Sequence, residues 1–151
     1  MQKIEFKDLP DTTTPITAYN LNLLQDNVEE GINGVVESGS NENGNYIKFY
    51  DGTLICYNTQ VFSDVACSYS WGNVYTNNND KRTFNDFPVN FIASPNVSLK
   101  VDTGTSDCWL MSAFQAGGPT TTNVGGWQIC RGAIGSSLDV TISYIAIGKW
   151  K

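Results

Sequence analysis

The sequence predicts a mainly β protein, in which an N-terminal extended segment and an α-helix precede an antiparallel β-sandwich of six or seven strands. Between residues 46 and 148, apolar and polar residues alternate in short runs that are separated by Gly, Asn, Asp and Pro. Period-two runs at intervals of roughly 10–15 residues indicate strands joined by turns. Residues 17–37 instead place an apolar side chain at every third or fourth position, which indicates a helix.

Composition excludes several kinds of chemistry. The 151 residues are enough to bury one core, and they include no His. Without His there is no Ser-His-Asp or Cys-His catalysis and no His-bearing zinc site. The net charge of −6 argues against binding to a nucleic-acid backbone. We find neither the apolar run of a signal peptide nor that of a membrane span, so we expect cytoplasmic synthesis and no membrane insertion.

Four cysteines, at positions 56, 67, 108 and 130, show no C-x-x-C spacing. That spacing would favour a metal or redox site, so we expect no metal and no cofactor. Cys56 and Cys130 lie in apolar runs and are expected to be buried thiols. Disulfides formed after release from the cell are the alternative, and sequence does not fix their pairing.

The acidity of the chain is concentrated at its N-terminus. Residues 1–40 hold seven of the fifteen acidic residues and two of the nine basic ones. Within this part, residues 1–16 are predicted to be extended, because Ile4 and Phe6 alternate with charges and two prolines disfavour a helix. A lone strand is not stable, so we expect this segment to dock on a partner.

A helix is predicted from a cap at Thr17 to an end at Gly39-Ser40. Its apolar positions recur with a mean spacing of 3.5 residues, the period of a left-handed coiled coil. A helix with such a seam and no partner in its own chain indicates association between chains. The alternative is a helix that lies on its own β domain. The seam residues are Leu21, Leu24, Val28, Ile32 and Val35.

Domain boundaries follow from these patterns: residues 1–40 form the attachment segment and helix, residues 41–45 a polar linker, and residues 46–151 the sandwich. Asp51-Gly52 predicts a hairpin turn. The last strand has apolar residues on both faces, as in a central strand or one at a subunit interface. The predicted strands are 46–50, 53–62, 84–92, 97–103, 108–115, 126–131 and 138–148.

Motifs at both ends of the chain resemble a known family. IEFKDLP at residues 4–10 and TPITAYNLN at residues 14–22 look like the N-terminal segment of tail-appendage proteins from phages and prophages of Gram-positive hosts. GNYIKFYDGTLIC at residues 44–56 and ISYIAIGKW at residues 142–150 are similar to the C-terminal domain of phage tail fibres, which is related to the H-type lectins.

This resemblance implies a homotrimeric receptor-binding protein in the virion tail, with an H-type-lectin-like sandwich. Its N-terminal segment would bind another tail or baseplate protein, and its far end would recognise host cell-surface polysaccharide or another glycan. Several H-type lectins use a His in sugar binding, which this chain lacks. No ligand residue is therefore carried over.

Candidate ligand residues are aromatic side chains near Asp, Asn or Arg, because sugars stack on rings and hydrogen-bond through hydroxyls. Core or interface positions are nevertheless the favoured interpretation of the three tryptophans among them, and a solvated turn is the favoured interpretation of Asp80 with Arg82. The candidates are Trp71, Tyr75, Asn77, Asp80, Arg82, Asp107, Trp109 and Trp127.

Catalysis is not expected. A polysaccharide depolymerase would need two carboxyls about 5–10 Å apart, one of them with a raised pKa, and no motif indicates such a pair. A purely structural trimeric tip module is the second alternative to a receptor-binding role. A metal ion held by oxygen atoms on a threefold axis between chains is a further alternative.

Overall fold

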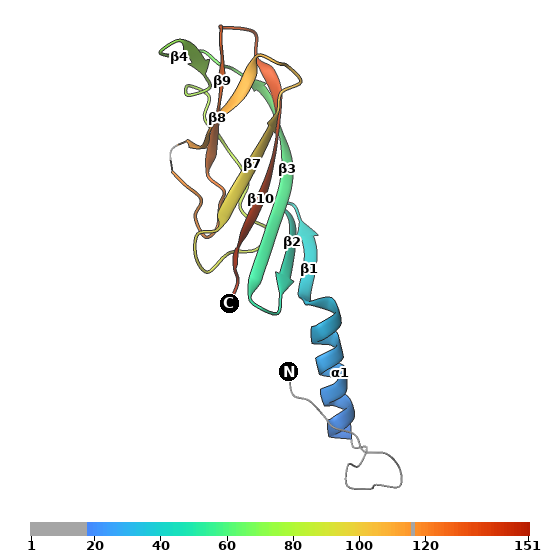
Figure 1. Ribbon diagram of the computed structural model, residues 1–151. Coiled ribbons are helices and arrows are strands. Elements are labelled where there is room, and N and C mark those ends of the chain that lie inside the picture. Colours follow the sequence, from blue (N-terminus) through green and yellow to red (C-terminus); the bar gives the residue numbers. More distant parts are fainter. Residues whose placement is uncertain (1–17, 116) are drawn as a thin grey trace, which may run out of the picture.

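The computed structural model describes residues 18–115 and 117–151, and it consists of one helix that leads into a body of β-strands (Figure 1). In chain order the elements are α1 (Ala18–Asn33), β1 (Val35–Asn41), β2 (Gly44–Phe49), β3 (Thr53–Val65), β4 (Tyr69–Trp71), β5 (Val74–Thr76), β6 (Arg82–Thr83), β7 (Asn96–Asp102), β8 (Cys108–Gln115), β9 (Gly126–Arg131) and β10 (Leu138–Lys149).

Two antiparallel sheets make up the β body. Sheet A has the strand order β1-β2-β3-β10-β7, and sheet B has the order β4-β5-β9-β6, with β8 paired to β9. One buried apolar cluster includes residues from both sheets, so the sheets pack face to face over a common core. The expected mainly β, antiparallel architecture is confirmed, with ten strands described where six or seven were predicted.

Strand β10 lies in the middle of sheet A, between β3 and β7. Its residues alternate as the sequence predicts: Val140, Ile142, Tyr144 and Ala146 are at most 2% exposed. Ile145 and Ile147, on the opposite face, are 51% and 47% exposed. The strand is therefore central, and its outer face is apolar as well.

Aromatic rings join the two sheets. Trp127 of β9 packs against Phe62 of β3 at a centroid distance of 4.9 Å. Phe84 meets Tyr144 of β10 edge-on at 5.2 Å. Edge-to-face and tilted pairs of this kind add to the free energy of burial. Sheet B is thus held in a fixed position over sheet A.

The helix ends six residues before its predicted end. Gly34 adopts a positive φ of 54°, the left-handed conformation that stops many helices. Residues 35–49 then form a hairpin, β1 paired with β2, and the expected linker at 41–45 supplies its turn. Val35 belongs to β1, so its place in the helical seam was wrong. By chance, the helical spacing of apolar residues continues into β1. The strand that pairs with β1 is β2, which lies about ten residues further along the chain.

Residues 84–92 are not a strand, although their apolar side chains are in the core as predicted. Phe84, Phe87 and Phe91 are each 3% exposed. The backbone there is irregular, with one isolated bridge from Asp86 to Asn123. Pro88 and Pro95 offer no N–H to a strand ladder, which explains why buried apolar residues did not produce a strand here.

Part of the N-terminal prediction lies outside the described residues. The extended segment 1–16 and the cap at Thr17 are not described, nor is the side chain of Ile32. Leu21, Leu24 and Val28 are described, and they are 54%, 43% and 45% exposed on α1, which projects away from the sheets (Figure 1). In the described part of the chain, no helix is long and apolar enough to cross a membrane.

Candidate ligand-binding site at the end opposite the helix

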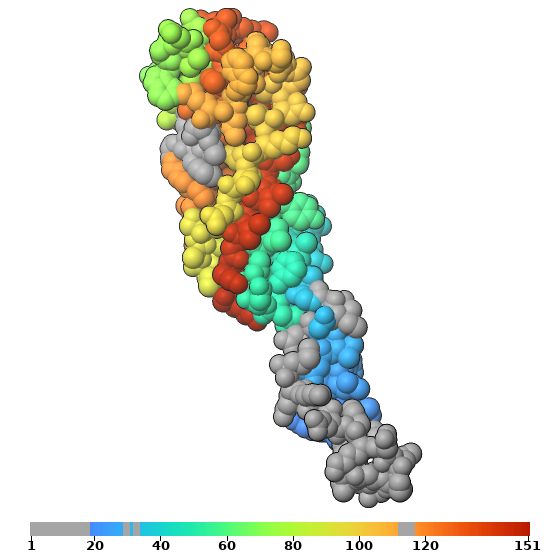
Figure 2. Space-filling model, in the orientation of Figure 1, coloured from blue at the N-terminus to red at the C-terminus, as the bar shows by residue number. Residues whose placement is uncertain are grey.

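Strand β4 lies at the end of the sandwich farthest from α1, where its neighbourhood forms the green tip of the space-filling view (Figure 2). β4 and β5 form a short hairpin whose turn contains Gly72 at a φ of 59°. Tyr69 and Trp71, two residues apart on β4, are 41% and 59% exposed. Two large aromatic rings are thus displayed at the tip.

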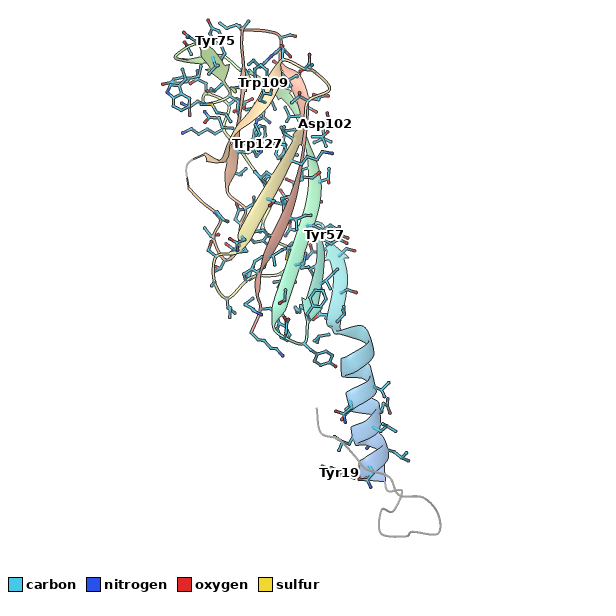
Figure 3. All side chains as sticks on the ribbon, in the orientation of Figure 1. Tyr19, Tyr57, Tyr75, Asp102, Trp109 and Trp127 are labelled. Carbon is cyan, nitrogen blue, oxygen red and sulfur yellow. The ribbon has the colours of Figure 1, made fainter. Side chains whose placement is uncertain are left out.

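The strand register places a third aromatic ring on the same face of sheet B. Tyr69 pairs with Thr76, Thr76 with Cys130, and Cys130 with Trp109. Residues paired across antiparallel strands point to the same side of a sheet, so Tyr69 and Trp109 share one face. Three strand spacings separate them, about 14 Å. Trp109 is 53% exposed, and Figure 3 shows it on this part of the molecule.

A surface hollow of about 240 Å³ lies on this face, and we call it the tip hollow. Tyr69, Trp71, Asn78 and Gln128 line it. The buried Thr76 hydroxyl accepts hydrogen bonds from Gln128 Nε2 at 3.2 Å and from the Asn78 backbone N at 3.3 Å. The hollow therefore combines two rings with two side-chain amides, one of them oriented by Thr76.

Two of the eight predicted ligand residues lie on this face: Trp71 lines the hollow, and Trp109 lies on the same side of the sheet. Two other aromatic candidates turn inward. Trp127 is fully buried, and Tyr75 packs against the core. On β9, Trp127 alternates with the outward Gln128, so Trp127 takes the core position that was the favoured alternative to a ligand contact.

Asn77 is buried, and its side chain binds backbone groups of its own chain. Its Oδ1 accepts a hydrogen bond from the Ile129 backbone N at 3.0 Å, and its Nδ2 donates to the Asp80 carbonyl at 3.2 Å. Asp80 N in turn donates to the Asn77 carbonyl at 2.8 Å. The side chain satisfies backbone groups that would otherwise be buried and unpaired.

Replacing Asn77 by Ala is expected to lower the free energy of unfolding by about 1–3 kcal/mol, because the Ile129 N–H loses its acceptor in the core. Chemical denaturation measures the change. Asn79→Ala, at an exposed position two residues on, is the matched control and should unfold like the parent. Equal stability of the two variants would contradict the structural role of Asn77.

The charged candidates form ion pairs with one another and are not among the residues that line the tip hollow. Arg82 binds Asp80 through Nε at 2.6 Å and Nη2 at 3.1 Å, and it holds the pKa of that carboxyl below its usual range. Arg131 pairs with Asp107 at 2.6 Å and lowers its pKa in the same way. These pairs order the loops between strands.

The sequence did not single out Tyr69, Asn78 or Gln128, although they line the hollow. Tyr69 is two residues from Trp71, and this aromatic pair at alternate positions was the one usable signal. Among residues 18–115 and 117–151, no group of three or more Cys, Asp or Glu is arranged to hold a metal ion.

Solved structures that are similar to this chain include an N-truncated R1-type pyocin tail fibre, which is 17% identical. The match covers 88% of this chain and 97% of that one, at a TM-score of 0.47. A C-terminal fragment of an R1 pyocin fibre from P. aeruginosa is 15% identical; the match covers 95% of this chain and 35% of that one, at a TM-score of 0.45. No family model matches the chain, and no curated protein does. At this level of sequence identity and structural similarity, the function of these proteins cannot be assigned to the chain.

Proposed function

We propose that the chain is a phage tail-fibre receptor-binding protein that recognises a host cell-surface glycan as a homotrimer and without catalysis. The observation that carries the proposal is the tip hollow, with its exposed rings and amides at the end opposite α1. A fibre attached through its N-terminal segment presents that end to the host. The motif at residues 4–10, which resembles tail-appendage proteins, and the motif at residues 142–150, which resembles the C-terminal domain of phage tail fibres, support the same role.

The lining of the hollow is suited to sugar chemistry. The rings of Tyr69 and Trp71 offer flat apolar faces to the C–H side of a sugar ring. The amides of Asn78 and Gln128 each carry donors and an acceptor, which match hydroxyl groups of either orientation. All four lining side chains are uncharged, so we expect binding to depend little on salt concentration.

Exposed apolar surface supports the proposed homotrimer. Alone, a helix of 16 residues is marginal in water, and α1 presents Leu21, Leu24 and Val28 to solvent. The outer face of sheet A adds Tyr57 and Ile145, which pair across strands β3 and β10. Apolar patches of this kind mark interaction surfaces. Copies of the chain would cover them, and three shallow sites on one stalk would gain avidity.

Trp71→Ala is expected to weaken binding to the target glycan roughly tenfold or more, because removal of a central ring costs most of the stacking energy. Binding to polysaccharide purified from Gram-positive cell walls, measured by biolayer interferometry, tests this. Tyr50→Ala is the matched control, since it removes an exposed ring from the turn between β2 and β3. Equal loss in both variants would place the binding site elsewhere.

Incubation of the intact protein with purified cell wall separates the three functional classes. Saturable binding without released sugar supports the proposal. Released sugar would indicate a depolymerase, and neither binding nor release would support a purely structural tip module. Parallel assays with the Trp71→Ala variant show whether the response comes from the tip hollow.

A further inference from the structure

A row of paired residues crosses sheet B near the tip, and we call it the tip row. Strand pairing joins Tyr69 of β4 to Thr76 of β5, and Thr76 to Cys130 of β9. Cys130 in turn pairs with Trp109 of β8. The four side chains point to the same side of the sheet, because each pair lies directly opposite across antiparallel strands. The tip row therefore has a large aromatic ring at each end and two small side chains between them.

The tip hollow includes only one end of this row. It is lined by Tyr69, Trp71, Asn78 and Gln128, and its volume is about 240 Å³. Pockets that enclose a drug-sized molecule have volumes of about 300–1,000 Å³, so the hollow is suited to roughly one sugar. Trp109, at the other end of the row, is not among its lining residues, yet it is 53% exposed on the same side of the sheet.

We propose that the tip binds a run of about three sugars within an uncharged polysaccharide, and that Trp109 stacks on a sugar beyond the one in the tip hollow. This inference rests on the glycan-binding role proposed above and specifies its class of ligand. Tyr69 and Trp109 are three strand spacings apart, about 14 Å. A sugar ring is about as wide as one such spacing, about 5 Å, so a single sugar does not reach both rings.

The middle of the tip row leaves room for the chain of sugars. Thr76 is fully buried, and its hydroxyl accepts the hydrogen bond from Gln128 Nε2 at 3.2 Å. Cys130 is half-buried. No large side chain of the row therefore stands between Tyr69 and Trp109. Gln128 lies two residues from Cys130 on β9, on the same side of the sheet, where its amide would meet the hydroxyl groups of the middle sugar.

The side chains of the tip row and of the tip hollow are all uncharged. Recognition of phosphate or carboxylate groups in a polymer relies on Arg and Lys. The two arginines in the strands of sheet B are Arg82 and Arg131, and each is already paired with an aspartate, Asp80 and Asp107. The net charge of −6 also repels a polyanion. These observations favour an uncharged polysaccharide over an anionic one.

Competition by soluble fragments of the polysaccharide tests the proposed length of the ligand. The intact protein binds a sensor that carries polysaccharide purified from Gram-positive cell walls, and the competitors are fragments of the same polymer, from single sugars to hexasaccharides. Trisaccharides and longer fragments should compete roughly tenfold or more better than single sugars, because they gain the second ring. Trp109→Ala should bring this ratio close to one. Trp109→Phe should retain most of it, since a ring remains.

Tyr50→Ala is again the matched control, and it should keep the ratio of the parent protein. Thermal unfolding followed by circular dichroism checks that each variant is folded. If the polysaccharide binds but single sugars compete as well as trisaccharides, or if Trp109→Ala keeps the full ratio, the inference is wrong and the glycan-binding role stands. If the polysaccharide does not bind at all, both are wrong. Tighter, strongly salt-dependent binding to a phosphate-containing wall polymer would overturn the assignment to uncharged polysaccharides.

Discussion

Replacing Leu24 and Val28 together by Asp is expected to convert the proposed homotrimer into monomers. Both residues lie on the exposed apolar stripe of α1, at 43% and 45% exposure. In a three-helix seam the change would bring six carboxylates into apolar surroundings, and each unpaired buried charge costs several kcal/mol. Light scattering coupled to size exclusion should report a mass that falls from three times 16.6 kDa to 16.6 kDa.

A charge-matched variant keeps this test specific. Asn22→Asp with Gln25→Glu adds the same two negative charges at exposed positions outside the stripe, and it should leave the mass unchanged. Loss of three linked sites should also weaken binding to cell-wall polysaccharide by roughly a hundredfold. A parent protein that is already monomeric would refute the coiled-coil seam, and a monomeric variant that binds at full strength would refute the argument from avidity.

Long strands with strict alternation were predictable from the sequence. The bounds of β8 and β9 agree with the predicted 108–115 and 126–131, and the two faces of β10 agree residue by residue. The residues of such a strand are enough to identify it, because burial of one face makes apolar and polar residues alternate with a period of two. The hairpin of β1 and β2 was missed because Val35 fits a helical spacing, and only the left-handed Gly34 interrupts the helix.

The tip hollow could be predicted only in part, because it depends on register. Trp71 and Trp109 stood out as aromatic residues beside polar ones. Their common face results from pairings that run from Tyr69 through Cys130, across about sixty residues of sequence. Strands β4, β5 and β6 have two or three residues each, too few to show a period.

Ile142→Asp is expected to prevent folding of the sandwich. Ile142 is fully buried in the central strand of sheet A, where it pairs with Gln60 of β3 and Val101 of β7. A carboxylate at this position would lose its hydration inside a core built from apolar side chains. The cost is about 4 kcal/mol or more, a large fraction of the roughly 5–15 kcal/mol that stabilises a domain. Insoluble protein, or soluble protein without a cooperative thermal transition, is the expected result.

Ile145→Asp is the matched comparison, because it makes the same substitution three residues later on the other face of β10. Ile145 is 51% exposed, so its carboxylate stays hydrated, and the sandwich should fold and unfold cooperatively. Circular dichroism during heating compares the two variants. If both fold equally well, the assignment of inner and outer faces to β10 is wrong. If Ile145→Asp folds but has a lower assembled mass, the outer face of sheet A belongs to the contact between copies.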